Sequence, residues 1–196
     1  MPTEPIQVKT SWEQAYQQGH WDCLTSDAEY AHNLVVAGFV RRHAAPFCLL
    51  DVGCGSGAIL RHLELSVVTH YTGVDLAQAA LDRIEPKRAQ DRYICSSLEE
   101  FNPDDKWDVI LFNEVLYYTC DPVAQLAKLE KCLHPDGFFV ISMHKKANPF
   151  AYNNRCIRQV RDYFARADYC VLDAVEVCRM ASGAKWQVFL VRPPIV

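Results

Sequence analysis

The chain is 196 residues long, a length that one hydrophobic core can organise, so we expect a single domain. Hydrophobic residues make up 50% of it and charged residues 22%, which excludes a disordered or fibrous chain. The formal net charge of −4 at pH 7 repels a polyanion, so we do not expect nucleic acid as a partner.

Cysteine usage and the opening segment indicate the compartment. The chain has nine scattered cysteines and no C-x-x-C pair, which is evidence against a disulfide framework or a zinc site. The opening residues Met1–Val8 are polar and lack the apolar stretch of a signal peptide. No segment has the roughly 20 apolar residues of a membrane span. We therefore expect a cytoplasmic protein that does not associate with membranes.

A helix is predicted over Asp27–His43. Ser26 and Glu29 have the spacing of a capping box, and the basic residues 41–43 complement the helix dipole at the other end. We expect this helix to cover the sheet before its first strand.

From Phe47 onward, short apolar runs alternate with helical patterns, which is typical of a parallel sheet with helices on both faces. The clearest helix is Pro122–Leu133, because Asp121 caps it and the His-Pro-Asp-Gly sequence of residues 134–137 stops it. The strands expected are 47–52, 67–75, 92–95, 107–112 and 138–143.

The last part of the chain follows a different pattern. A helix over Asn154–Arg166 precedes two long strands, Tyr169–Val177 and Lys185–Val191. The short turn between these strands allows only antiparallel pairing. A parallel sheet that ends in such a hairpin leaves no room for a separate substrate domain. We therefore expect loops and the N-terminal segment to hold a substrate.

A glycine-rich turn follows the first strand. Gly53, Gly55 and Gly57 stand where the strand runs into a predicted helix, and such a turn lets a ligand approach bare backbone. Together with Ala58, the glycines also fit the dinucleotide fingerprint G-x-G-x-x-A. The glycine pattern alone does not identify the ligand.

The charge of Asp51 favours a cationic ligand over an anionic one. This residue stands two positions before Gly53, where its carboxylate faces whatever lies across the loop and would repel a pyrophosphate. Two unit charges about 4 Å apart interact by roughly 4 kcal/mol at an effective dielectric constant of about 20. S-adenosylmethionine carries a sulfonium and an ammonium, so it suits this loop better than a dinucleotide does.

A second acid, Asp75, ends the next strand. It lies 22 positions after Gly53 (75 minus 53), where a carboxylate can accept both hydroxyls of a ribose. Each such charge-assisted bond contributes about 1.5–3 kcal/mol. NAD also offers this ribose, so Asp75 does not separate the two ligands.

Taken together, these residues resemble the motifs of the class I methyltransferases that depend on S-adenosylmethionine. The resemblance runs from Leu49 to about His144: Asp51–Gly57 resembles the first motif, the strand ending at Asp75 the second, and Cys95–Glu99 the adenine-contacting segment. It implies an α/β fold with a doubly wound, mostly parallel seven-stranded sheet of order 3-2-1-4-5-7-6, one antiparallel strand, and helices on both faces.

The resemblance also implies three parts of a single methyltransferase domain over residues 1–196. These are an N-terminal lid and helix (1–45), a cofactor-binding core (46–144), and a substrate-side helix with an antiparallel hairpin (145–196).

The cofactor implied is S-adenosyl-L-methionine. The residues expected to bind it are Trp12, Tyr16, Asp51, Gly53, Cys54, Gly55, Asp75, Leu76, Ser97, Leu98 and Asn113. The segment Asn113–Tyr118 is similar to that of the nodulation N-methyltransferases and is expected to face the acceptor. Glu114, Tyr117 and His144 are the candidate catalytic residues, with Glu114 or His144 as a general base. The acid triad of catechol-type members is absent, so we expect no metal.

The N-terminal segment is similar to the lid of the thiopurine and tellurite methyltransferases. Trp12 and Tyr16 lie one helical turn apart, behind a Thr10 and Glu13 pattern typical of a capping box. Their rings either dock this helix on the core or close over the sulfonium, which an aromatic face attracts by about 0.5–2 kcal/mol.

The function expected is methyl transfer to a nitrogen, oxygen or sulfur atom of a small-molecule acceptor. Three alternatives stay open: a protein that binds the cofactor or a partner without turnover, an RNA or protein methyltransferase, and an NAD-dependent oxidoreductase. The three-residue spacing of Arg155, Arg158 and Arg161 indicates a solvated helix face in preference to a phosphate-binding one. The pattern leaves the oligomeric state open.

Overall fold

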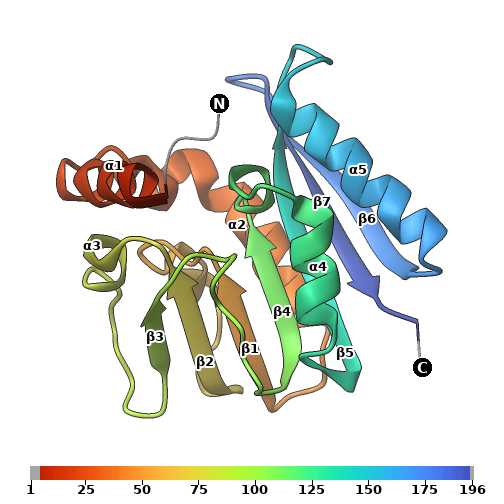
Figure 1. Cartoon of the computed structure of the whole chain (residues 1–196), viewed down its shortest axis with the longest axis horizontal. Coiled ribbons are helices and arrows are strands. Elements are labelled where there is room, and N and C mark those ends of the chain that lie inside the picture. The colour runs from red at the N-terminus through yellow and green to blue at the C-terminus, as the bar shows by residue number, and fades with distance from the viewer. Residues whose placement is uncertain (1–4, 195–196) are drawn as a thin grey trace.

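The computed structural model describes residues 5–194, so the first four residues of the polar opening segment lie outside the described residues. Figure 1 shows one sheet with helices packed on both faces. Its seven strands are β1 (Phe47–Val52), β2 (Val68–Asp75), β3 (Arg92–Cys95), β4 (Trp107–Asn113), β5 (Leu133–Lys145), β6 (Cys170–Arg179) and β7 (Ala184–Arg192).

The strand order is β3-β2-β1-β4-β5-β7-β6, which confirms the doubly wound sheet expected from the resemblance. Strands β1 to β5 pair in parallel, whereas β7 pairs antiparallel with both β5 and β6. The chain order reverses between β1 and β4. In open α/β sheets, ligands bind outside the carboxyl ends of the strands at this point.

Helices cover the two faces of the sheet unequally. Helices α4 and α5 lie on one face, α2 lies on the other, and α1 crosses above the carboxyl ends of β2 and β3 (Figure 1). The long helices are α1 (Pro5–Gln17), α2 (Asp27–Val40), α4 (Pro122–Glu130) and α5 (Tyr152–Arg166), and the short ones are η1 (Asp22–Thr25), η2 (Ala58–His62), α3 (Gln78–Leu81) and η3 (Leu116–Tyr118). Within residues 5–194, every helix is too short or too polar to cross a membrane.

The central strands are buried on both faces because side chains alternate along a strand. In β1, Leu50 and Val52 pack in the cluster beneath α4 and α5, whereas Leu49 packs in the cluster beneath α2. Asp51 lies two positions after Leu49 and therefore on the same face of the sheet, and it is only 1% exposed. A carboxylate this deep at the end of an otherwise apolar strand indicates a role other than packing.

Several helices are shorter than the sequence pattern predicts. The helix expected after the glycine turn is only the 3-10 helix η2, α2 ends at Val40 instead of His43, and α4 ends at Glu130 instead of Leu133. Leu133 pairs with Trp107 and opens β5, and residues 134–137 form an irregularity in that strand where the register shifts. Strand pairing therefore overrides the helix-stop signal there.

The predicted capping box at the start of α2 does not form. Ser26 Oγ accepts a hydrogen bond from the Ala28 amide, as an N-cap should. The Glu29 carboxylate, however, does not turn back to the cap and lies 3.3 Å from His32 Nδ1 instead. A contact one turn further along the same helix has therefore taken the place of the cap.

The second predicted capping box is also wrong. Helix α1 begins before Thr10, so Thr10 is an interior residue of the helix. Glu13 accepts a hydrogen bond from the Ala79 amide of α3 at 3.1 Å. This contact docks the N-terminal helix beside the second strand.

Candidate active site

A cavity of about 620 Å³ opens at the carboxyl ends of β1, β2 and β4. The loops that follow these strands form its floor, and residues of α1 and α2 complete its walls. It therefore lies where the strand order reverses, which is where ligands bind in open α/β sheets.

The glycine turn after β1 has a backbone that other residues rarely adopt. Gly53, Gly55 and Gly57 have φ angles of +70°, +54° and +73°. A Cβ on Gly53 would lie 2.3 Å from Val115 Cγ2, and a Cβ on Gly55 would lie 2.7 Å from Tyr16 Oη. Both conformation and space require glycine, so the loop presents bare backbone to the cavity.

The Asp75 carboxylate joins β2 to the glycine turn. Its Oδ2 accepts a hydrogen bond from the Gly55 amide at 2.8 Å, and its Oδ1 accepts one from the Ala77 amide at 2.9 Å. Burial raises the pKa of Asp75, and the two amide bonds act in the opposite direction. Each oxygen retains lone-pair capacity for a further donor.

Asp51 is the most deeply buried acid of the cavity lining. The Tyr71 hydroxyl donates a hydrogen bond to Asp51 Oδ2 at 2.8 Å. Burial raises the pKa of Asp51 to about 7, because its effect is larger than the opposing effect of the hydrogen bond from Tyr71. A cation placed beside Asp51 would restore its ionised form.

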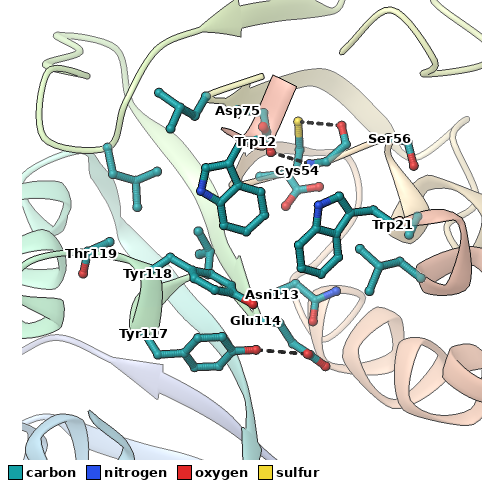
Figure 2. Close-up of a pocket in the computed structure, with 18 of the residues that line it drawn as sticks. Trp12, Trp21, Cys54, Ser56, Asp75, Asn113, Glu114, Tyr117, Tyr118 and Thr119 are labelled. Carbon is teal, nitrogen blue, oxygen red and sulfur yellow. Dashed lines mark hydrogen bonds between the residues drawn. The ribbon is translucent and has the colours of Figure 1, made fainter. Parts of the chain in front are cut away.

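Three aromatic rings form the middle of the cavity. Trp12 and Trp21 stack with centroids 5.0 Å apart, and the Tyr118 ring meets Trp12 edge-on at 4.8 Å. Figure 2 shows these rings between Asp75 at one end and Glu114 with Tyr117 at the other. They give a positively charged ligand apolar, electron-rich surfaces to pack against.

Glu114 lies at the end of β4 in a strained conformation. Its φ of +58° is uncommon for a residue other than glycine, and such strain costs on the order of 1 kcal/mol. The Tyr117 hydroxyl donates to Glu114 Oε2 at 3.0 Å, as Figure 2 shows. Burial raises the pKa of Glu114. Strain that is retained at a cavity wall is typical of a functional residue.

His32 of α2 connects Glu114 to two other side chains. Its Nδ1 lies 3.3 Å from Glu29 Oε2 and 3.5 Å from Glu114 Oε1, and its Nε2 lies 2.5 Å from Ser142 Oγ. The ring is 2% exposed and stacks on Trp186 at 4.8 Å. Both ring nitrogens therefore already have partners within the protein.

The structure brings all the predicted site residues to this cavity except His144. The lining includes Trp12, Tyr16, Asp51, Gly53, Cys54, Gly55, Asp75, Leu76, Ser97, Leu98, Asn113, Glu114 and Tyr117. His144 lies in β5 outside the lining, 5.5 Å from the Trp186 ring, and burial lowers its pKa. Of the two candidate bases, only Glu114 faces the cavity.

Sequence reasoning missed the contribution of α2. Glu29, His32 and Asn33 all line the cavity, and Asn33 Oδ1 accepts a hydrogen bond from Asn113 Nδ2 at 3.3 Å. One signal was present, because His32 lies four and eight residues before the buried Val36 and Val40. A polar residue on the apolar face of a helix calls for a buried partner.

The comparison with known families shows which family the chain belongs to. A family model described as "Methyltransferase domain" matches residues 14–189 of the chain. The chain belongs to this methyltransferase-domain family. The match runs from the last turn of α1 through the glycine turn and into β7, and it confirms the resemblance found in the sequence.

Solved structures of other proteins show the same fold. The methyltransferase domain is similar to the N-methyltransferase NodS from Bradyrhizobium japonicum WM9 in complex with S-adenosyl-L-homocysteine, with a TM-score of 0.77, 18% identity, and coverage of 93% of this chain and 98% of the other. It is also similar to a 1,6-didemethyltoxoflavin-N1-methyltransferase from Burkholderia thailandensis, with a TM-score of 0.75, 19% identity, and coverage of 98% and 92%.

Curated relatives match the methyltransferase domain over a shorter stretch. A malonyl-[acyl-carrier protein] O-methyltransferase of Bacillus cytotoxicus is 28% identical over 127 residues, which are 63% of this chain and 42% of the relative. A ubiquinone biosynthesis O-methyltransferase of Bradyrhizobium diazoefficiens is 31% identical over 99 residues, covering 48% and 38%. The chain thus spans less than half the length of these two relatives.

Proposed function

We propose that this chain is an S-adenosylmethionine-dependent methyltransferase that methylates a nitrogen, oxygen or sulfur atom of a small molecule. One observation carries the proposal: two buried carboxylates, Asp51 and Asp75, end neighbouring strands on either side of a glycine turn that presents bare backbone. Such a pair suits a cationic nucleoside better than a pyrophosphate, which both charges would repel.

The residues present fit this cofactor. Asp75 has lone pairs left for the ribose hydroxyls, and Asp51 offers its charge to the ammonium. Ser97 and Leu98 line the cavity beyond β3, where they would hold the adenine. Trp12 and Tyr16 of α1 cover the cavity as a lid would.

The methyl carbon of S-adenosylmethionine is already activated by its sulfonium. This chain's residues then have to align the acceptor atom in line with the carbon–sulfur bond and keep water away. The rings of Trp12, Trp21 and Tyr118 pack against one another in the middle of the cavity, and there they would limit the access of water to a bound acceptor. Of the two candidate bases, Glu114 is the one in the lining, where it could take a proton from an acceptor.

The proposal extends to the acceptor, the architecture and the compartment. We assign residues 1–196 to one methyltransferase domain, in which α1 closes the cavity. Because the cavity is covered and its lining is acidic, it does not suit an RNA phosphate backbone. All nine cysteines are unpaired in the described chain, which suits a reducing cytoplasm.

Two measurements test the proposal. Calorimetry should detect binding of S-adenosylmethionine and no binding of NADH, since only the first ligand matches the charge of Asp51. Transfer of a labelled methyl group to the small-molecule fraction of a cell extract should then be observed. Cofactor binding without any labelled product would identify a binding protein, and NADH binding without S-adenosylmethionine binding would identify a dinucleotide site.

A further inference from the structure

We infer that the acceptor is an organic amine, which enters as an ammonium cation and binds between Glu114 and Glu29. This inference rests on the proposed methyl transfer, because it concerns the acceptor end of the same cavity. It is carried by an excess of acidic groups, by the partners of His32, and by the aromatic walls.

The charge of the cavity is strongly unbalanced. Its lining contains six carboxylates and a single lysine, namely Glu29, Asp51, Asp75, Glu99, Glu100 and Glu114 against Lys9. Asp51 and Asp75 face the cofactor end. Glu29 and Glu114 lie at the other end, beside β4 and α2, and there the lining has no lysine or arginine. A cationic acceptor would offset this charge, whereas a carboxylate or phosphate would be repelled.

His32 does not neutralise the two glutamates. Its Nδ1 contacts Glu29 and Glu114, and its Nε2 contacts Ser142 Oγ, so a protonated ring would supply one positive charge for two negative ones. Glu114 Oε1 is buried and lies 3.5 Å from His32 Nδ1. Burial raises the pKa of Glu114 and hydrogen bonding from the Trp186 side chain lowers it, but neither His32 nor Trp186 has good hydrogen-bond geometry to Oε1. A bound ammonium, with three N–H donors, supplies both the missing charge and new donors for this pair of carboxylates.

The neighbouring rings favour an organic cation over a metal ion. Glu29, His32 and Glu114 have ligand atoms within 4.8 Å of one another, which could also hold a metal. However, the rings of Trp12, Trp21 and Tyr118 contact one another, and they lie between Glu114 and Asp75 (Figure 2). Aromatic faces bind alkylammonium groups well, whereas a hard metal ion prefers oxygen ligands and waters, which these rings do not provide.

The proton and electron balance of the step is complete with Glu114. The ammonium first loses one proton to the Glu114 carboxylate, whose pKa burial raises. The freed nitrogen lone pair then forms the bond to the methyl carbon, and the electrons of the carbon–sulfur bond return to sulfur. The products are S-adenosylhomocysteine and a methylated ammonium, and Glu114 releases its proton to water. The net reaction produces one proton.

The first experiment identifies the acceptor by its chemistry. The full chain is incubated with trideuteromethyl S-adenosylmethionine and the heat-treated, low-molecular-mass fraction of a cell extract, with the same mixture lacking protein as the control. We expect mass spectrometry to find the label on the nitrogen of an amine. Label on oxygen or sulfur, or on an acidic acceptor, would overturn the amine while the methyltransferase stands. Absence of any labelled product would overturn both.

The second experiment tests the two glutamates with matched variants. For the amine so identified, Glu114→Gln and Glu29→Gln should each lower kcat/KM by about tenfold or more, since each keeps the shape and removes one charge. The Kd of S-adenosylmethionine, measured by calorimetry, should stay within about twofold, which also shows that the variants fold. Glu64→Gln, which changes an exposed glutamate outside the lining, should match the wild type. Unchanged kcat/KM in both cavity variants would overturn the inference.

A third arm separates an ammonium from a metal. We expect EDTA to leave the rate of methyl transfer unchanged, and Mg²⁺ or Zn²⁺ not to raise it. Loss of activity with EDTA and its recovery with either ion would assign the Glu29, His32 and Glu114 group to a metal and overturn the ammonium.

Discussion

The Asp75 carboxylate accepts a hydrogen bond from the Gly55 amide at 2.8 Å, which fastens the end of β2 to the glycine turn after β1. The acid that would hold the ribose and the turn that would approach the nucleoside are therefore one structural unit. A change at either residue moves the other, so the cofactor site responds to mutation as a whole.

Removal of the Asp75 side chain should weaken cofactor binding. Asp75→Ala leaves the Gly55 and Ala77 amides without their acceptor and removes at least one charge-assisted bond to the ribose, so we expect the Kd of S-adenosylmethionine to rise about tenfold or more. Calorimetry measures this, with the exposed Asp82→Ala as the control. An affinity equal to that of the wild type would show the ribose assignment to be wrong.

Gly53 and Gly183 have the same φ of +70°, so alanine substitutions at the two positions distinguish the cost of backbone strain from the cost of steric overlap. A Cβ on Gly183 meets nothing within 4 Å, whereas a Cβ on Gly53 meets Val115 Cγ2 at 2.3 Å. We expect Gly183→Ala to lower the free energy of unfolding by about 1 kcal/mol, and Gly53→Ala to lower it by about 2–4 kcal/mol. Urea unfolding of the two variants checks the difference. Equal losses of unfolding free energy would mean that the Val115 side chain moves aside without an energetic cost.

The pKa of Asp51 should make cofactor binding depend on pH. Burial raises this pKa to about 7, and the ammonium of the cofactor favours the ionised carboxylate, so binding releases a proton near neutral pH. We expect affinity to rise between about pH 6 and about pH 8. Calorimetry in buffers of different ionisation enthalpy measures the released proton. Asp51→Asn should bind more weakly and lose the part of the pH dependence that Asp51 contributes, while any contribution of Asp75 stays.

The stability of the free protein should change in the opposite direction. The folded-state pKa of Asp51 lies above its unfolded value of about 3.9, so the folded state holds more protons in between, and the stability from the neutral acid is lost as pH rises through about 7. From about pH 5 to about pH 8 this amounts to about 2–3 kcal/mol. Burial raises the pKa of Asp75 and Glu114 too, so the effect of Asp51 is the difference from Asp51→Asn.

Removal of the lid should cost activity but not folding. In the described structure, Tyr16 packs with Ala77 and Ala80 in a small cluster separate from the two clusters that flank the sheet. We expect a chain without residues 1–22 to melt cooperatively and to lose about tenfold or more of its methyl-transfer rate, because water then reaches the cavity. Circular dichroism and the transfer assay test this. Loss of cooperative melting would assign α1 to the core.

Much of the cofactor end could be predicted from the sequence because its residues stand at fixed places relative to strand ends. Gly53 follows β1 and Asp75 ends β2, and parallel strands bring their carboxyl ends to one edge of the sheet. The extents of the helices were predicted less well. Glu13 and Glu29 have the spacing of capping boxes, yet neither carboxylate turns back to a cap. Glu13 accepts a hydrogen bond from the Ala79 amide 66 positions away, and Glu29 contacts His32 one helical turn further on.

The sequence by itself determined the positions of the strands, the glycine turn and the two acids that flank it, since strand alternation and turn chemistry are local properties of the chain. The order of the strands in the sheet was implied by the resemblance to the methyltransferase family. Only the tertiary structure decided the acceptor end. His32 and Ser142 meet across 110 positions, and Glu114 joins them from a third element. No spacing rule relates α2, β4 and β5, because their contact depends on how a helix packs across the face of the finished sheet.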